Sequence, residues 1–198
     1  MADKLVFYHN PMSRGRIVHW MLEEVGAPYE TRIIDLKKRE QKSPEYLAVN
    51  PMGKIPAIVH GDTVVTETAA ICAYLADAFP GARLAPPVGD HARGTYYRWL
   101  FFGAGALEPA LFDRAMARPP VEREGMLAYG TYESAVGALE KARAPGPWSL
   151  GDRFSAADVY VGAQVGWGLQ MKSLEPRPAF QQYGDRCAQR PAFKRTQG

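Results

Sequence analysis

The order of apolar runs in the first 80 residues constrains the fold more than any other feature of the sequence. The segment 4–8, KLVFY, is short and mostly apolar and predicts a β-strand. The segment 14–26 has apolar residues at the spacing of an amphipathic helix, which we expect to end at Gly26. The segment 29–35, YETRIID, predicts a second strand. A strand, a helix and a strand in this order require a parallel strand pair with a right-handed crossover.

The next segments extend this unit into a small mixed sheet. Residues 43–49, SPEYLAV, predict a short helix or a loop. Residues 57–67, AIVHGDTVVTE, contain two apolar runs joined by His-Gly-Asp, which is typical of a β-hairpin. Residues 68–79 predict a closing helix. We therefore expect an α/β domain with helices on both faces of one sheet.

A break in composition follows this pattern. Residues 80–94 hold three prolines and three glycines, which indicates a linker, and the remaining sequence has helical periodicity without strand signals. We predict an α/β domain over residues 1–79 and a linker over 80–91. An all-helical domain of about four or five helices is predicted over 92–198.

Composition excludes several classes of function. The chain has 198 residues, 46% of them hydrophobic and 23% charged, with a formal net charge of only +3. That charge is too small to indicate a nucleic-acid or membrane partner. The longest apolar run, residues 99–107, is too short to span a bilayer, and the first residues lack the pattern of a signal peptide. We expect a cytoplasmic protein, and the basic run 37–42, KKREQK, is either a solvated face or the rim of an anion-binding cleft.

Cysteine and histidine spacing indicates no metal site. The two cysteines, Cys72 and Cys187, do not form a C-x-x-C motif, and the four histidines show no ligand spacing. Cys72 lies in an apolar helical stretch, where we interpret it as a small core residue.

Two polar stretches lie where strands meet helices. Ser13 precedes the first helix, where it is either an N-cap or a hydroxyl that donates to a bound thiolate. Arg14 and Arg16 add positive charge near the same helix start, which itself favours an anion. Glu67 and Thr68 lie where the last strand meets the last helix of the first domain, and there they either cap the helix or form a polar pocket. In that pocket, a carboxylate would bind the hydroxyl and free N–H groups while Glu67 takes an ammonium group.

The segment Gly-Lys-Ile-Pro, residues 53–56, places a proline at the start of a buried strand. Proline cannot donate a ladder hydrogen bond, so its position calls for another reason. If the Ile55–Pro56 peptide bond is cis, the chain turns sharply at this point. A turn of this kind would present the N–H and C=O of Ile55 to an extended peptide.

Together these segments resemble the cytosolic glutathione transferase family. SRGRIVHWMLEE (13–24) resembles the first helix of bacterial members, and NPMGKIPAIV (50–59) resembles the family's Asn-Pro-x-Gly-Lys-x-Pro segment. TETAAICAYL (66–75) resembles its Glu-Ser-x-x-Ile segment, with Thr68 in place of serine. SLGDRFSAADV (149–159) resembles the inner-helix signature of the second domain. In that signature Ser155 and Asp158 also have the spacing of a capping box.

The resemblance implies a thioredoxin-like N-terminal domain, an all-α C-terminal domain, a homodimer and glutathione bound mainly by the first domain. It implies that Ile55, next to Pro56, pairs with the cysteinyl backbone of glutathione, and that Glu67 and Thr68 hold its γ-glutamyl end. The proline of the matching family motif is cis, and with the place of Pro56 at the start of a strand this predicts that the Ile55–Pro56 peptide bond is cis. By the same comparison Lys54 and Gln41 contact the glycyl carboxylate.

For the group that activates the thiol, the resemblance favours Ser13. Tyr8, His9 and Asn10 lie near enough in sequence to be alternatives. No cysteine occurs in this loop, which disfavours the cysteine-type classes of the family.

The implied function is conjugation of the glutathione thiolate, as co-substrate and without a further cofactor, to a hydrophobic electrophile in detoxification. The second substrate is expected against the helical domain, with five candidate contacts: Tyr96, Trp99, Phe102, Met116 and Trp167. Two alternatives remain open. One is glutathione-dependent reduction of a disulfide or peroxide on the same fold, and the other is a binding module of this fold without turnover.

Overall fold

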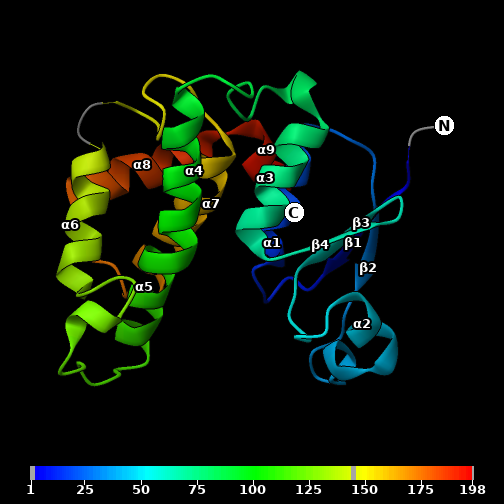
Figure 1. Ribbon diagram of the computed structural model, residues 1–198, viewed down its shortest axis with the longest axis horizontal. Helices are drawn as coiled ribbons and strands as arrows, with labels where there is room; N and C mark the ends of the chain where they lie inside the picture. The colour runs from blue at the N-terminus through cyan, green and yellow to red at the C-terminus, as the bar shows by residue number, and fades with distance from the viewer. Residues whose placement is uncertain (1–2, 144–145, 198) are drawn as a thin grey trace. The chain divides into compact units, whose positions relative to one another are not determined.

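The chain divides into two compact units, each with its own secondary structure (Figure 1). The computed structural model describes residues 3–143 and 146–197. Unit 1 comprises Met1–Arg83 and Pro191–Gly198, and unit 2 comprises Leu84–Arg190. The chain passes from unit 1 to unit 2 between residues 83 and 84, inside the segment predicted as a linker.

A four-stranded mixed sheet in the order β2-β1-β3-β4 forms the centre of unit 1. The strands are β1 (Leu5–His9), β2 (Glu30–Ile33), β3 (Ala57–His60) and β4 (Thr63–Thr66). β2 runs parallel to β1, as the strand-helix-strand order predicts. β3 runs antiparallel to both β1 and β4, so the predicted hairpin is confirmed.

Four α-helices lie in the described part of unit 1. They are α1 (Gly15–Val25), α2 (Pro44–Val49), α3 (Thr68–Ala78) and α9 (Pro191–Arg195). α1 buries the apolar stripe that the sequence predicts, and Gly26 ends it in the left-handed conformation with φ 70°. The start of α1 differs from the expectation, because Arg14 occupies the N-cap position and Ser13 lies one residue earlier. The Ser13 side chain instead caps the turn that leads into the helix, where Gly15 N–H donates to its Oγ.

The sheet sends alternate side chains of β1 to opposite faces. On one face, the ring centroid of Phe7 lies 4.8 Å from that of His9 and 6.5 Å from that of His19 in α1. On the other face, the ring of Tyr8 lies edge-on to that of Tyr46 in α2, with centroids 5.5 Å apart. α1 and α2 therefore cover different residues at the end of the same strand.

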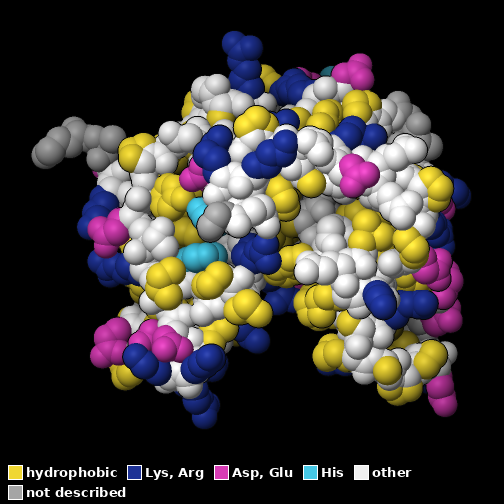
Figure 2. Space-filling view, turned by 180° about the vertical axis from the view of Figure 1, so that it is seen from behind, with side chains coloured by type: hydrophobic (Ala, Val, Ile, Leu, Met, Phe, Trp, Pro, Cys, Tyr) yellow, Lys and Arg dark blue, Asp and Glu magenta, His cyan; other side chains and the backbone are white. Residues whose placement is uncertain are grey.

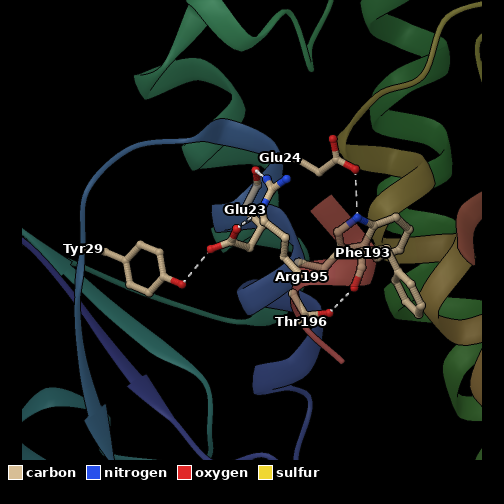
Figure 3. Close-up of polar contacts among 7 residues, drawn as sticks. Glu23, Glu24, Tyr29, Phe193, Arg195 and Thr196 are labelled. Atoms are coloured by element: carbon tan, nitrogen blue, oxygen red, sulfur yellow. Dashed lines mark hydrogen bonds and ion pairs between the residues drawn. The ribbon is translucent and has the colours of Figure 1, made fainter. Parts of the chain in front are cut away.

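α9 is held in unit 1 by contacts with α1 (Figure 3). The ring of Phe193 lies edge-on to Trp20, with centroids 5.0 Å apart. Arg195 Nε donates to Glu23 Oε2 across 2.5 Å, and Tyr29 Oη donates to the other oxygen of the same carboxylate. The sequence analysis predicted one helical domain over residues 92–198. The structure corrects this boundary, because the residues after 190 belong to unit 1.

Unit 2 is helical. Its described helices are α4 (Ala92–Phe102), α5 (Glu108–Ala115), α6 (Tyr132–Arg143), α7 (Ala156–Gln170) and α8 (Pro178–Gln189). A π-helical segment, Gly103–Leu107, joins α4 to α5. The predicted fold class, a thioredoxin-like α/β domain followed by an all-α domain, is confirmed. Across residues 3–143 and 146–197, no helix is both long enough and apolar enough to cross a bilayer.

The predicted capping box at the start of α7 is present. Asp158 is fully buried, and its carboxylate accepts bonds from the N–H and Oγ of Ser155 at 3.1 Å. It also accepts from Ser149 N at 2.7 Å and from Tyr183 Oη at 2.9 Å. Because a buried charge is tolerated only when its lone pairs are satisfied, these four donors stabilise the carboxylate and connect α7 to α8.

Candidate active site

Three segments of unit 1 meet at one edge of the sheet. The strand register places Tyr8, Ala57 and Thr66 in one row across β1, β3 and β4. β1 and β4 run toward this edge, whereas β3 runs away from it. The loop after β1, the segment before β3 and the start of α3 are therefore brought together, and they contain most of the predicted site residues.

Hydrogen bonds of Asn10 and Ser13 fix the loop after β1. Asn10 Nδ2 donates to Ile34 O, and its Oδ1 accepts from Met12 N, both across 2.8 Å. Ser13 Oγ donates to Asn10 O across 2.7 Å and accepts from Gly15 N across 3.0 Å. The hydroxyl that the family resemblance favoured for thiol activation is thus held, partly buried, at the start of α1.

The three alternatives to Ser13 lie in different surroundings. Tyr8 Oη accepts from Arg32 Nη1 across 3.2 Å on the sheet face that packs against α2. Both ends of the Asn10 amide hold the loop together. His9 is buried on the α1 face, and burial, with further contributions from His19 and Arg16, lowers its pKa to about 4.

Gly15 allows His9 to pack beneath the first turn of α1. A Cβ atom on this glycine would lie 2.4 Å from His9 Nδ1, which is closer than real contacts allow, and 3.0 Å from Ser13 Oγ. His9 Nδ1 is buried without a hydrogen-bond partner in the described structure. Burial therefore favours the neutral form of this imidazole.

The Ile55–Pro56 peptide bond is cis, as predicted. The preceding carbonyl, that of Lys54, accepts from Tyr46 Oη across 2.5 Å and from Asn50 Nδ2 across 2.8 Å. Asn50 also closes the turn, since its side chain accepts from Met52 N across 3.1 Å. Ile55 lies two residues before Ala57, the first residue of β3 and the one paired with Tyr8, so its peptide groups stand outside the end of that ladder.

Sequence reasoning missed the contributions of Tyr46 and Asn50. Both are buried, and both position the backbone next to Ile55 rather than facing a ligand. Burial raises the pKa of Tyr46 to about 12, so its hydroxyl remains a donor across the physiological range. The Asn-Pro dipeptide at residues 50–51 is a turn signal from which the role of Asn50 could have been predicted.

Gln41 lies beside the same turn. Gly53 has φ 59°, and a Cβ atom there would lie 2.6 Å from the carbonyl oxygen of Gln41. Lys42 Nζ donates to Met52 O across 3.0 Å and links the two segments further. Gln41 Oε1 is buried and has no partner within the residues described. Gln41 therefore lies beside the turn that precedes Lys54, and contact of these two residues with a glycyl carboxylate stays a prediction.

The basic run 37–42 is mostly solvated. The side chains of Lys37, Lys38, Arg39 and Lys42 are exposed. Figure 2 shows Lys and Arg side chains gathered with Asp and Glu side chains at its lower left, over the end of unit 1 that carries α2. This mixture of charges favours the solvated-face interpretation over a purely positive rim.

Glu67 has a strained backbone at the start of α3. Its φ of 62° and ψ of 118° lie in a region that residues with a Cβ atom rarely adopt. Its side chain is exposed, whereas Thr68 is 7% exposed. Strain of this kind persists only where the surroundings impose it, and it is concentrated at binding sites. Glu67 makes no side-chain cap bond to α3, which leaves its carboxylate available to a ligand.

Unit 2 contains a mainly apolar recess between α5 and α7 with about 260 Å³ of empty space, part of it open to solvent. Its lining residues are Leu111, Phe112, Ala115, Gln164, Trp167, Gly168, Met171 and Ser173. Of the aromatic and methionine candidates from the sequence, Trp167 lines this recess. Tyr96 and Trp99 are buried core residues, Phe102 is partly buried and Met116 is exposed.

Neither cysteine is available for chemistry in the folded chain. Cys72 and Cys187 are free and buried, and burial raises the pKa of the Cys72 thiol. The interpretation of Cys72 as a core residue is confirmed. No cluster of three or more His, Cys, Asp or Glu side chains suited to a metal ion occurs in the described part of the chain.

Comparison with known proteins identifies the family. The family model described as "Glutathione S-transferase, N-terminal domain" matches residues 4–77. Glutathione S-transferase GstA of Escherichia coli O157:H7 is 31% identical over 190 residues, which cover 93% of this chain and 92% of that protein. The chain belongs to the glutathione S-transferase family. A further relative in this family, the disulfide-bond oxidoreductase YfcG of Escherichia coli K12, is 30% identical over 93% of this chain and 90% of its own length.

Solved structures of family members have the same fold. A glutathione transferase from Burkholderia graminis, with two glutathione molecules bound per subunit, has a TM-score of 0.80 at 27% identity and covers 98% of this chain and 87% of its own. The transferase URE2P6 from Phanerochaete chrysosporium, in complex with oxidized glutathione, has a TM-score of 0.81 at 27% identity, covering 98% and 95%. The thioredoxin-like and helical parts of this glutathione S-transferase family member therefore both have counterparts of known structure.

Proposed function

We propose that this protein binds glutathione in unit 1 and transfers its thiolate to an apolar electrophile. The observation that carries the proposal is the convergence at one sheet edge of three groups with complementary chemistry. These are the Ser13 hydroxyl at the start of α1, the backbone of Ile55 beyond the end of its ladder, and the strained Glu67 at the start of α3.

Each part of glutathione has a matching group in this arrangement. The N–H and C=O of Ile55 pair with the cysteinyl backbone as an added strand would. Glu67 accepts from the γ-glutamyl ammonium group, and Thr68 with the first turn of α3 binds the γ-glutamyl carboxylate. Lys54 takes the glycyl carboxylate, with Gln41 at its side. Pro56 maintains the turn in which the N–H and C=O of Ile55 face glutathione.

The Ser13 hydroxyl activates the thiol in this proposal. A free thiol with a pKa near 8.5 is only a few per cent ionised at neutral pH. Ser13 Oγ now donates to Asn10 O and turns its hydrogen toward the sulfur when glutathione binds. A bond from a hydroxyl and a helix N-terminus together lower a thiol pKa by about one to two units, which makes most of the thiol nucleophilic at neutral pH.

The recess of unit 2 receives the electrophile. Its apolar lining suits a hydrophobic molecule, and Trp167 offers an aromatic surface for it. The family assignment also supports action as a homodimer in cytoplasmic detoxification. Tyr97 and Phe101, one turn apart on α4, are exposed and offer apolar surface for a second copy of the chain.

Binding and turnover are tested separately. Isothermal titration calorimetry with glutathione should give a 1:1 complex per chain, and Glu67→Gln should weaken it while leaving the fold intact by circular dichroism. Conjugation is then measured with glutathione and a panel of benzyl and aryl chlorides. Binding without turnover toward any of them would favour the alternative of a non-catalytic binding module.

The relationship to the disulfide-bond oxidoreductase supports a second candidate function, glutathione-dependent reduction of a disulfide. Because both cysteines of this chain are buried, the reducing thiols would come from glutathione. Two glutathione molecules would then give oxidised glutathione and two product thiols per disulfide. Assaying 2-hydroxyethyl disulfide reduction beside benzyl chloride conjugation, with the same preparation, distinguishes the two activities. A reductase rate without conjugation would replace the first proposal.

A further inference from the structure

The peptide group that joins Lys54 to Ile55 is hydrogen-bonded on one side only. Its carbonyl oxygen accepts from Tyr46 Oη across 2.5 Å and from Asn50 Nδ2 across 2.8 Å. In the described part of the chain, no group accepts from the N–H of Ile55, and none donates to the carbonyl oxygen of Ile55. Ile55 is nevertheless only 9% exposed, and backbone groups of buried residues are almost always paired. This residue therefore keeps one donor and one acceptor for a ligand.

The two bonds to the Lys54 oxygen determine where the Ile55 N–H points. Among the described residues the cis peptide bond is the one between Ile55 and Pro56, so the Lys54–Ile55 bond is trans. In a trans peptide the C=O and the N–H point in opposite directions. Tyr46 lies in α2 and Asn50 is the residue that ends it, so both donors hold the oxygen toward α2. The Ile55 N–H is therefore directed away from α2.

The packing of Tyr46 fixes the position of its hydroxyl. The side chain is 3% exposed and belongs to one hydrophobic cluster with Ile55. Its ring lies edge-on to that of Tyr8, with centroids 5.5 Å apart. A hydrogen bond from a donor shielded from water is strengthened, and it polarises the peptide that accepts it. The bond from Tyr46 therefore also makes the Ile55 N–H a better donor.

We propose that the two donors to the Lys54 oxygen, Tyr46 above all, set the affinity for glutathione by aiming and polarising the Ile55 N–H. This N–H donates to the cysteinyl carbonyl of glutathione. The inference rests on the proposed function, because it takes the cysteinyl backbone as the partner of Ile55. Tyr46 is a positioning residue, since it acts through the Lys54–Ile55 peptide. Its effect is confined to binding of the main chain of glutathione and does not extend to the thiol.

Isothermal titration calorimetry on the whole protein tests the inference with glutathione as the ligand. Tyr46→Phe keeps the ring and should raise the Kd about three- to tenfold, the range expected for one hydrogen bond. The pKa of the bound thiol, followed by the ultraviolet absorbance of the thiolate, should remain that of the parent because Ser13 is unchanged. The matched control Tyr74→Phe removes a hydroxyl that is hydrogen-bonded to His60 at the other end of β3, and it should leave the Kd unchanged.

A second ligand separates loss of the aimed N–H from a general structural defect. In γ-glutamyl-cysteinyl-glycolate an ester replaces the peptide between cysteine and glycine, and an ester carbonyl is a weaker acceptor than an amide carbonyl. The parent should therefore bind the ester less tightly than glutathione. This difference should shrink in Tyr46→Phe, because the N–H is no longer aimed at the carbonyl. A general defect would weaken both ligands by the same factor.

The outcomes separate this inference from the proposed function. A parent protein that does not bind glutathione overturns the proposed function, and the inference falls with it. Equal Kd values for glutathione in the parent and Tyr46→Phe overturn the inference alone, as does an equal loss for both ligands or equal binding of both by the parent. Should Tyr46→Phe fail to fold, Asn50→Asp decides. It retains an oxygen for Met52 N but removes the second donor to the Lys54 oxygen, and an unchanged Kd there overturns the inference.

Discussion

Replacing His9 with glutamine should make the free energy of unfolding fall less when the protein is acidified. The folded chain buries this imidazole beside Phe7 and His19, and burial lowers its pKa from 6.5 to about 4. An unfolded chain has no such environment, so there the ring takes up a proton near pH 6.5. Between these two values the unfolded state binds more protons than the folded state, and acid therefore favours unfolding.

The size of the effect follows from the two pKa values. Above pH 6.5 the ring is neutral in both states and contributes no pH dependence. As the pH falls below 4 the cost approaches about 3.4 kcal/mol, since each unit of pKa difference corresponds to about 1.36 kcal/mol. At pH 5 the cost is about 2 kcal/mol, which shifts a urea midpoint by about 1 M at a typical denaturant dependence.

The assay is urea unfolding of the parent and His9→Gln at pH 7.5 and pH 5.0. The substitution has its own packing cost at pH 7.5, so the quantity compared is the loss of stability between the two pH values. That loss should be about 2 kcal/mol smaller in His9→Gln, while His91→Gln, which changes an exposed histidine, should match the parent. Equal losses in the parent and His9→Gln would refute the assignment of a depressed pKa to this ring.

Three further substitutions, two of them with a control variant, test other parts of the structure. Ser13→Ala should lower the conjugation rate at least tenfold and raise the apparent pKa of bound glutathione by about one to two units, and overlapping pH–rate profiles would count against this role. Gly53→Ala should lower the free energy of unfolding by more than about 1 kcal/mol and weaken glutathione binding, because the φ of Gly53 is positive and the carbonyl oxygen of Gln41 blocks the Cβ position. Gly26→Ala, strained but in open space, should lower stability without changing that affinity. Asp158→Ala should lower the free energy of unfolding by at least about 3 kcal/mol and leave the affinity for glutathione unchanged. The control Asp152→Ala should keep the denaturant midpoint of the parent. The same parental midpoint in Asp158→Ala would contradict the prediction.

Features governed by neighbouring residues could be predicted from the sequence. The parallel pair of β1 and β2, the hairpin of β3 and β4, and the capping box of Ser155 and Asp158 all follow from short patterns of apolar, turn and capping residues. The cis bond before Pro56 was predicted from such a pattern together with a family motif. Each of these features depends on residues within about thirty positions of one another.

Features that depend on distant contacts could not be predicted. Nothing local to His9 indicates that it faces α1, because a strand pattern does not tell which face each helix covers. Gln164 and Glu108 are 56 positions apart, and their hydrogen bond depends on the packing of α7 against the helix formed by α4 and α5. The start of α1 differed by one residue because Ser13 bonds to the turn before the helix, a competition that residue preferences do not resolve.

The return of α9 to unit 1 has a consequence for how the protein is made. Residues 84–190 are synthesised between the two pieces of unit 1, so the sheet and α1 leave the ribosome long before Phe193 and Arg195 exist. During that interval Trp20 lacks the ring that covers it, and Glu23 lacks its guanidinium partner. The N-terminal unit can therefore begin to fold during translation, but it is completed only after the whole helical unit has emerged.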